Sequence, residues 1–252
     1  MSVTPHCSPT EWQLRCELAA LYRLVAHFRM TDLIDTHISL RVPGPEHHFL
    51  INRYGVLFDH MRASDLVLID KEGRRVDPAY EAHNVNEAGF VIHSAIHLAR
   101  EDMNCVIHTH TAAGMAVSAQ AHGLLPITQH ALKFYGKLAY HTYEGVALHL
   151  EERERLVRDL GPHRAMILRN HGLLAGGRTV AEAFHEIHFL ERACQAQVQA
   201  LTGGSELIYP SEAVCRLTAS QFTDDEAGLA LMQLAWEAAL KLIADQREDY
   251  CS

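Results

Sequence analysis

The chain has 252 residues, a hydrophobic fraction of 48% and a formal net charge of -9 at pH 7. This length and hydrophobic content are enough to bury a large core. The negative charge, and the lack of a stretch rich in lysine and arginine, argue against nucleic acid or an anionic membrane surface as the partner and favour a small molecule.

No linker, low-complexity run or internal repeat divides the sequence, so we expect a single domain over residues 1–252. The N-terminus lacks the basic region and apolar core of a signal peptide, and no segment reads as long enough to span a membrane, which predicts a cytoplasmic protein. Six cysteines are scattered without a C-x-x-C pair. They are expected to be reduced thiols, which leaves histidine as the soft ligand for any metal.

Helix starts are predicted from capping boxes, in which a Ser, Thr or Asn caps the first turn and a Glu lies three residues later. The predicted caps are Ser8, Asn84, Thr179 and Thr223. The first helix should run to about Arg29, and the helix from Thr179 should end at Gly203-Gly204. A further helix at 151–160, rich in Glu and Arg, is expected to be a solvated face without a catalytic role.

Short strands are predicted between these helices. Residues 37–42, 49–52 and 66–70 alternate or run apolar between turn sequences, which indicates an antiparallel meander, and residues 104–110 and 165–175 add interior strands. Strands with helices on both sides predict an α/β fold, a three-layer αβα sandwich with a mixed, largely antiparallel central sheet.

Three histidines follow buried strands. His108 and His110 finish the strand at 104–110, where a period of two places both side chains on one face, and His171 lies in the turn after the apolar run at 165–168. Three imidazoles on one metal would leave a coordination position open, as in catalytic sites. The competing interpretation is that the His-x-His pattern arose by chance, because the chain has 19 histidines and a histidine at a strand end is usually structural.

These motifs, taken together, resemble the class II aldolase and adducin family. The resemblance covers about residues 10–205 and leaves a C-terminal helical segment at 205–252. It implies a mixed sheet between helical layers and a homotetramer with active sites at subunit interfaces. The resembling segments are 36–41, 49–55, 86–97, 105–111, 125–127, 139–141 and 170–174.

The resemblance implies one divalent metal, with Zn²⁺ first and Mn²⁺ or Fe²⁺ as alternatives, held by His108, His110 and His171. Aldolases of the family add a glutamate from the preceding helix, which also serves as the general acid/base. By an ungapped count, that position is Gly89 in this chain.

Another group must then carry the proton. Candidates are a water molecule on the metal, His93, Glu87, and a Tyr209 lent by a neighbouring subunit. Glu87 lies two positions before Gly89, and residues two apart on a helix face different directions, so its competing role is in the capping box. His93 and His97 could grip a metal as an i, i+4 pair, and packing against the sheet is the competing role.

The phosphate pocket of the sugar-phosphate aldolases is altered in this sequence. Its donor pairs correspond to Thr36-His37, Tyr54-Gly55 and Glu87-Ala88, and a carboxylate there would repel a phosphate. We therefore expect a small, non-phosphorylated oxo acid, hydroxy acid or sugar-like substrate. His37 and Arg53 remain as candidate binders of a carboxylate or another oxygen-rich group.

The resemblance thus implies a metal-dependent aldolase-type carbon-carbon lyase, acting by retro-aldol cleavage or decarboxylation through a metal-stabilised enolate. Three alternatives stay open at this stage: a non-haem iron oxygenase of the same fold, an enzyme that isomerises or dehydrates a sugar acid, and a non-catalytic adducin-like interaction module.

Overall fold

The computed structural model describes residues 7–44, 46–145 and 150–252, apart from the side chains at 87, 88 and 150–152. Within these residues, seven strands form one sheet in the order β3-β2-β1-β4-β7-β6-β5. Neighbouring strands are antiparallel, except for the parallel pair β5 and β6. The strands are β1 (His37–Arg41), β2 (Phe49–Asn52), β3 (Leu66–Ile69), β4 (Cys105–Thr109), β5 (Leu138–His141), β6 (Ala165–Leu168) and β7 (Gly172–Gly177).

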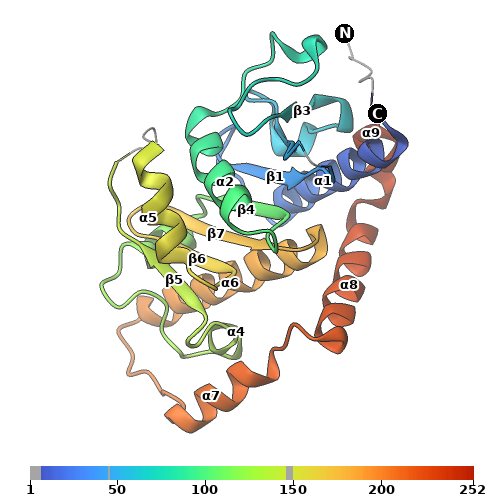
Figure 1. Ribbon diagram of the computed structural model, residues 1–252. Helices are drawn as coiled ribbons and strands as arrows, with labels where there is room; N and C mark the ends of the chain where they lie inside the picture. The colour runs from blue at the N-terminus through green and yellow to red at the C-terminus, as the bar shows by residue number, and fades with distance from the viewer. Residues whose placement is uncertain (1–6, 45, 146–149) are drawn as a thin grey trace.

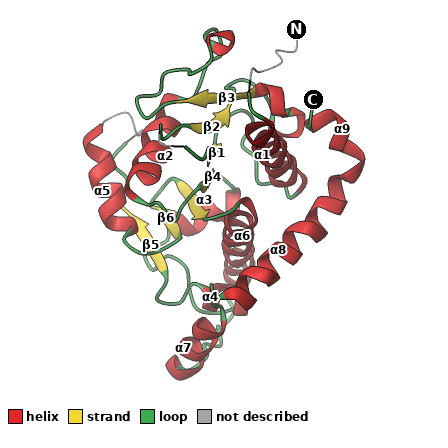
Figure 2. Cartoon of the chain, turned by 45° about the vertical axis from the view of Figure 1, so that its right-hand side comes forward, coloured by secondary structure: helices red, strands yellow, loops and turns green. Residues whose placement is uncertain are grey.

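Helices cover both faces of this sheet, which confirms the predicted αβα sandwich. In Figures 1 and 2, α2 and α5 lie on one side of the strands, and α1 and α6 on the other. The helices are α1 (Pro9–His27), α2 (Glu87–Ala99), α3 (Ala112–Ser118), α4 (Gln129–Lys133), α5 (Leu150–Leu160), α6 (Val180–Thr202), α7 (Glu212–Gln221), α8 (Glu226–Leu240) and α9 (Arg247–Tyr250).

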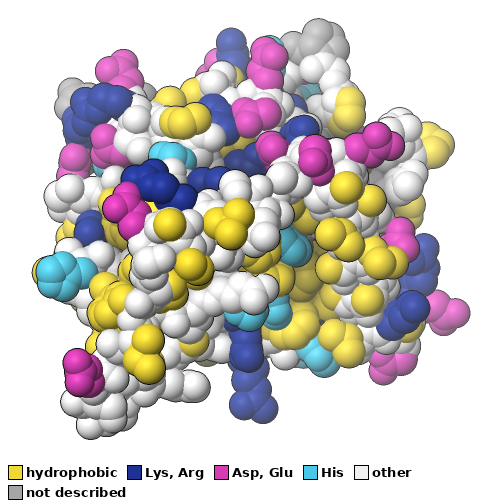
Figure 3. Space-filling model, turned by 90° about the horizontal axis from the view of Figure 1, so that it is seen from below, with side chains coloured by type: hydrophobic (Ala, Val, Ile, Leu, Met, Phe, Trp, Pro, Cys, Tyr) yellow, Lys and Arg dark blue, Asp and Glu magenta, His cyan; other side chains and the backbone are white. Residues whose placement is uncertain are grey.

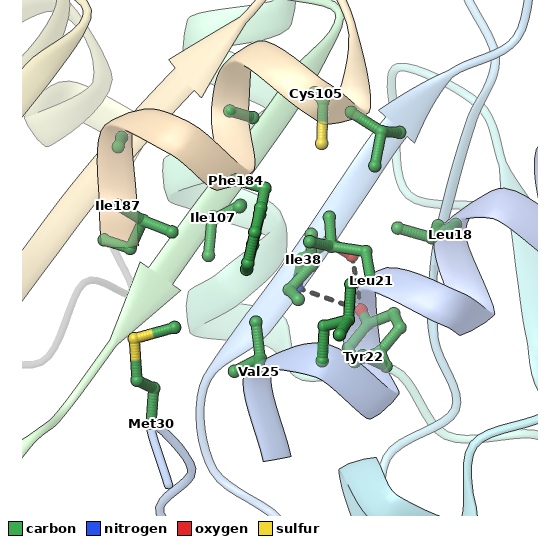
Figure 4. Packing of buried hydrophobic residues seen from close by; sticks show 14 of the residues in the cluster. Leu18, Leu21, Tyr22, Val25, Met30, Ile38, Cys105, Ile107, Phe184 and Ile187 are labelled. Carbon is green, nitrogen blue, oxygen red and sulfur yellow. Dashed lines mark hydrogen bonds between the residues drawn. The ribbon is translucent and has the colours of Figure 1, made fainter. Parts of the chain in front are cut away.

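The strands alternate between two buried layers. Ile107 of β4 packs in the cluster that also holds α1 and α6, while its neighbour Val106 packs in the cluster of α2 and α5. Figure 4 shows the first cluster, in which the hydroxyl of Tyr22 accepts a hydrogen bond from the amide of Ile38 at 2.9 Å. Because side chains alternate along a strand, His108 must share the face of Val106 and point toward α2.

The bounds of the predicted strands agree closely with those in the structure, with one refinement. The stretch 165–175 holds two strands, β6 and β7, which pair antiparallel on either side of the turn predicted after residue 168. Asn170 makes the turn with a φ of 55°. A left-handed residue of this kind reverses the chain, and asparagine tolerates it better than most residues. β5, four residues long, was not predicted as a strand.

Two helix starts were right and two were wrong by two residues. Ser8 and Thr179 cap α1 and α6 as predicted. However, Asn86 caps α2 instead of Asn84, and Asp225 caps α8 instead of Thr223. Asn, Asp and Thr are similar in their preference for this position, so two candidates two residues apart cannot be separated by residue type.

The helix at 151–160 is only partly a solvated face. Leu156 and Leu160 of α5 are buried in one cluster with Ile92 of α2. Asp159, on the same helix, lies 2.8 Å from Nδ1 of His141 at the end of β5. The helix therefore covers the sheet, and the prediction missed its apolar side.

The C-terminal helical segment packs back on the main core. The 25-residue stretch Glu226–Tyr250 is long and apolar enough to cross a membrane by length and composition alone, contrary to the expectation that no segment is. It comprises α8, a 3-10 turn at Lys241–Gln246 and α9. Its buried residues Trp236, Ile243 and Tyr250 belong to the cluster that holds α1 and α6.

Candidate metal centre

The three predicted metal ligands come together at one point. Nε2 of His108 lies 2.8 Å from Nε2 of His110 and 3.2 Å from Nε2 of His171. His108 lies in β4, His110 directly after it, and His171 in the β6–β7 hairpin beside it. Their ligand atoms all lie within 4.8 Å of one another, the spacing of groups that can share one ion.

The opposite ring nitrogens of two of these histidines are occupied. Nδ1 of His108 donates to the carbonyl oxygen of Leu173 at 2.9 Å, and Nδ1 of His110 lies 3.1 Å from a carboxylate oxygen of Asp32. Such partners hold a metal-binding imidazole in one tautomer and one orientation. Both rings therefore keep Nε2 free to bind a metal.

Burial keeps the cluster in its metal-binding form. It lowers the pKa of His108 well below the ordinary value, and it lowers the pKa of His171 to about 4. The neighbouring imidazoles add to both shifts. Neutral imidazole is the form that binds metals, so the donor set fits one divalent ion at neutral pH.

A glycine allows the hairpin to lie tight against β4. A Cβ at Gly172 would come within 2.3 Å of the carbonyl oxygen of Thr109. Backbone atoms cannot move aside as a flexible side chain can, so this position requires glycine if His171 is to reach His110. The Asn-His-Gly sequence thus has a local structural reason at its glycine.

A cavity of about 1080 Å³ opens in front of the histidine cluster. Thr36, directly before β1, has a φ of 76°, a strained conformation for a β-branched residue, and its buried hydroxyl has no hydrogen-bond partner in the described part of the chain. Strain and an unpartnered polar atom at one position are typical of a ligand site. Other lining residues include Asp35, His37, Tyr54, Glu72, Arg75, Asn84, Asn86 and Tyr143.

His37 and His93 are both near the histidine cluster, but only His37 lines the cavity. The two rings are joined by a hydrogen bond between Nδ1 of His37 and Nε2 of His93 at 2.8 Å. His93 is fully buried behind His37. His37 also pairs with His108 across β1 and β4, which explains why its ring faces the cluster.

The other predicted site residues are placed differently. The side chain of Arg53 is 43% exposed, its Nη1 lies 3.8 Å from a carboxylate oxygen of Asp65, and it does not line the cavity. Tyr209 is 52% exposed between α6 and α7 and does not line it either. Glu87 begins α2, and its side chain lies outside the described part of the structure.

Several residues of the site were missed from the sequence. Arg75 is the one Lys or Arg that lines the cavity among the described residues, and it donates two hydrogen bonds to the carbonyl oxygen of His83. Asp32 and Tyr143 were also missed. No spacing rule connects Asp32 to His110, which is 78 residues away, so only the folded chain could reveal this contact.

The chain resembles known proteins over most of its length. The sequence profile of the family described as Class II Aldolase and Adducin N-terminal domain matches residues 16–198. The crystal structure of an aldolase II superfamily protein from Pseudomonas syringae has a TM-score of 0.92 and 49% identity, with 100% of each chain covered.

Two further relatives carry names with different functions. L-fuculose 1-phosphate aldolase from Glaciozyma antarctica PI12 has a TM-score of 0.82 and 29% identity, over 99% of this chain and 97% of that chain. Alpha-adducin from Rattus norvegicus is 47% identical over 189 residues, which is 75% of this chain but 26% of the adducin.

Proposed function

The chain belongs to the class II aldolase and adducin family, and on this premise we propose that it is a metal-dependent carbon-carbon lyase. The observation that carries the proposal is the convergence of three Nε2 atoms, from His108, His110 and His171, on the wall of a large cavity. A divalent metal held there would act as a Lewis acid that stabilises the enolate formed when a carbon-carbon bond breaks. We propose zinc first, with manganese or iron as alternatives.

The remaining residues would bind and orient the substrate. Arg75 would bind a carboxylate, because it lines the cavity and its planar guanidinium suits that group. This role was expected of Arg53, which lies outside the cavity lining. Thr36 and Tyr143 offer hydroxyl groups in the same cavity.

We propose that the substrate is not phosphorylated. Of the described residues, Asp35 and Glu72 line the cavity together with Arg75, so a dianionic phosphate placed away from the metal would meet two carboxylates and one guanidinium. A small hydroxy acid, oxo acid or sugar-like compound carries at most one negative charge and suits this balance better. Glu87 and Tyr209 remain candidates for the proton carrier.

We further propose that each chain forms a single domain and that four chains assemble into a cytoplasmic homotetramer with active sites at subunit interfaces. The support is apolar surface near the C-terminus, where Leu217 of α7 and Leu231 and Leu234 of α8 are each at least 59% exposed. Hydrophobic side chains gather on the lower face of the molecule, interspersed with histidines (Figure 3). The exposed Tyr209 is accordingly available to a neighbouring subunit.

A second candidate is the non-catalytic interaction module. It is favoured by the 47% identity to alpha-adducin. Against it stands the clustered histidine site, since a pure scaffold has no need of an open metal centre. The iron oxygenase alternative is distinguished by the identity of the metal.

The first experiment is to measure metal content by plasma mass spectrometry on full-length protein purified without added metal or a histidine tag. About one zinc or manganese per chain is expected, and His110→Ala should lose it. His122→Ala, which removes an exposed histidine outside the cluster, is the matched control and should keep it. The metal-containing protein is then assayed for retro-aldol cleavage and decarboxylation of 2-hydroxy and 2-oxo acids.

Iron in place of zinc would favour the oxygenase. Protein that takes up no metal even after reloading would overturn the proposal and leave the interaction module as the better account.

A further inference from the structure

A chain of hydrogen bonds runs from the cavity into the interior behind the metal centre. Its links are His37 Nδ1 to His93 Nε2 at 2.8 Å, His93 Nδ1 to Ser39 Oγ at 2.6 Å, and Ser39 Oγ to His97 Nε2 at 2.6 Å. It ends where Nδ1 of His97 meets the carbonyl oxygen of Met103 at 3.1 Å. All four side chains are at most 3% exposed.

The carbonyl of Met103 determines the direction of every bond in this chain. A carbonyl oxygen can only accept, so Nδ1 of His97 carries the proton and, in a neutral ring, Nε2 does not. Ser39 must then give its single proton to His97 and accept from Nδ1 of His93. By the same reasoning, Nε2 of His93 is bare and accepts from Nδ1 of His37.

The neutral state of the rings follows from burial. It lowers the pKa of His97, the ring farthest from the histidine cluster, to about 3. His93 and His37 are equally buried, and their hydrogen-bond partners in the described part of the chain include no carboxylate, so a charge on either ring would be uncompensated. At neutral pH, all three rings therefore carry one proton each, on Nδ1. His37, at the cavity end, is left with a bare Nε2.

Gly89 makes room for this ring. A Cβ at that position would lie 2.3 Å from Cδ2 and 2.7 Å from Nε2 of His37. Nε2 has no hydrogen-bond partner among the described residues, although His37 lines the cavity. His37 is also absent from the group of histidines whose ligand atoms lie within 4.8 Å of one another.

We propose that His37 is a specificity-determining residue that accepts a hydrogen bond from a hydroxyl group of the substrate, with its acceptor polarity imposed by Met103 through His97, Ser39 and His93. The role of His37 in substrate binding rests on the proposed lyase function. The tautomer of its ring does not depend on that function. It also revises the expectation that His37 binds a carboxylate, because two acceptors repel each other. The preferred ligand is a 2-hydroxy acid or a polyol, not a 2-oxo acid.

The polarity is tested on the metal-free full-length protein by long-range ¹H–¹⁵N correlation spectra of the histidine rings. A bare ring nitrogen resonates far downfield of a protonated one, so the tautomer of each ring is read directly. Signals are assigned by comparison with His37→Phe, His93→Gln and His97→Gln. We expect His37, His93 and His97 all to carry the proton on Nδ1. A proton on Nε2 of His37 would overturn the proposal.

Ser39→Ala provides a test that leaves all the rings in place. Without the hydroxyl, His93 loses the group that selects its tautomer, so a second set of signals or averaged signals is expected for His93 and His37. Ser94→Ala is the matched control, because it removes an equally buried serine whose hydroxyl bonds only to helix carbonyls. Unchanged spectra in Ser39→Ala would contradict the imposed polarity.

The recognition role is tested by calorimetry with lactate and pyruvate on zinc-loaded protein. One neutral hydrogen bond predicts roughly a tenfold preference for lactate, which His37→Phe should abolish. If the native protein and His37→Phe prefer lactate over pyruvate to the same degree, His37 does not recognise the hydroxyl group and the proposal is overturned. If zinc binding itself moves the ¹⁵N signal of His37 as it moves those of His108, His110 and His171, His37 belongs to the metal and the proposal fails.

The experiments distinguish a failure of the lyase proposal from a failure of the proposal for His37. Absence of metal or turnover defeats the lyase but leaves the tautomers as predicted, whereas a wrong tautomer defeats the role of His37 and leaves the three-histidine centre intact.

Discussion

The ring of His37 fills the space directly beside Gly89, so close that a Cβ on the glycine would lie 2.3 Å from Cδ2 of the ring. The two residues are 52 positions apart, on β1 and α2, yet a side chain at Gly89 would collide with the ring of His37. In the sequence, Gly89 stands where the family's aldolases have a glutamate. In the fold, the absence of a side chain at Gly89 leaves room for the buried ring of His37.

Gly89→Ala should destabilise the protein by about 1–3 kcal/mol, the usual cost of overpacking a filled interior. Urea unfolding measures the effect. In a double-mutant cycle with His37→Ala, the cost should shrink, because the side chain that is hit has been removed. Additive effects would mean that the ring is not what Gly89 accommodates.

Asp32→Asn should weaken metal binding by about 10- to 100-fold, because the carboxylate orients the ring of His110 from its far nitrogen. Competition with a chromophoric chelator gives the affinity. Asp35→Asn is the control, since Asp35 lies three residues away, lines the cavity and accepts a hydrogen bond from the hydroxyl of Tyr54 instead of contacting a histidine. Equal losses in the two variants would point to general charge and not to orientation.

Arg75→Gln should reduce the affinity of zinc-loaded protein for lactate by roughly tenfold or more, as expected for loss of a hydrogen bond to a charged group. Arg53→Gln should leave the affinity unchanged, because Arg53 lies outside the cavity lining. Calorimetry measures both, and the melting temperature of each variant checks the fold. The reverse ranking would restore the role that the sequence suggested for Arg53.

Stability should fall in mild acid because His97 is buried neutral. Its pKa is about 3 in the folded chain against an ordinary value of 6.5, so between these values the unfolded chain binds more protons. The free energy of unfolding is then highest above pH 6.5 and declines as the pH falls toward 3. In metal-free protein, urea unfolding of His97→Gln should show a shallower decline than the native chain, while His122→Gln, at an exposed site, should not.

Leu231→Glu combined with Leu234→Glu should dissociate the proposed tetramer, because both leucines lie exposed on α8 and a buried, unpaired carboxylate is costly. Sedimentation equilibrium gives the mass. Gln233→Glu adds charge at an exposed position between them and should have a smaller effect, because residues one or two positions apart on a helix face different directions. A native chain that sediments as a monomer would remove the oligomer proposal.

Local sequence determined much of this protein. The period of two in β4 predicted that His108 and His110 share a face, and the apolar runs predicted β1, β2, β3 and β6 to within a residue or two. The Ser8 and Thr179 caps were read correctly, because capping depends on neighbouring backbone groups. Interactions between near neighbours in the chain are visible in the sequence.

The tertiary structure alone decided which distant residues complete the site. The contact of Asp32 with His110, the entry of Arg75 in place of Arg53, and the hydrogen-bond chain from His37 to Met103 all join segments that strand pairing and helix packing bring together. No local pattern encodes such contacts, because they depend on register across the sheet and on the docking of α2. The clustering of His108, His110 and His171 was predictable from sequence, while the orientation of their rings required the fold.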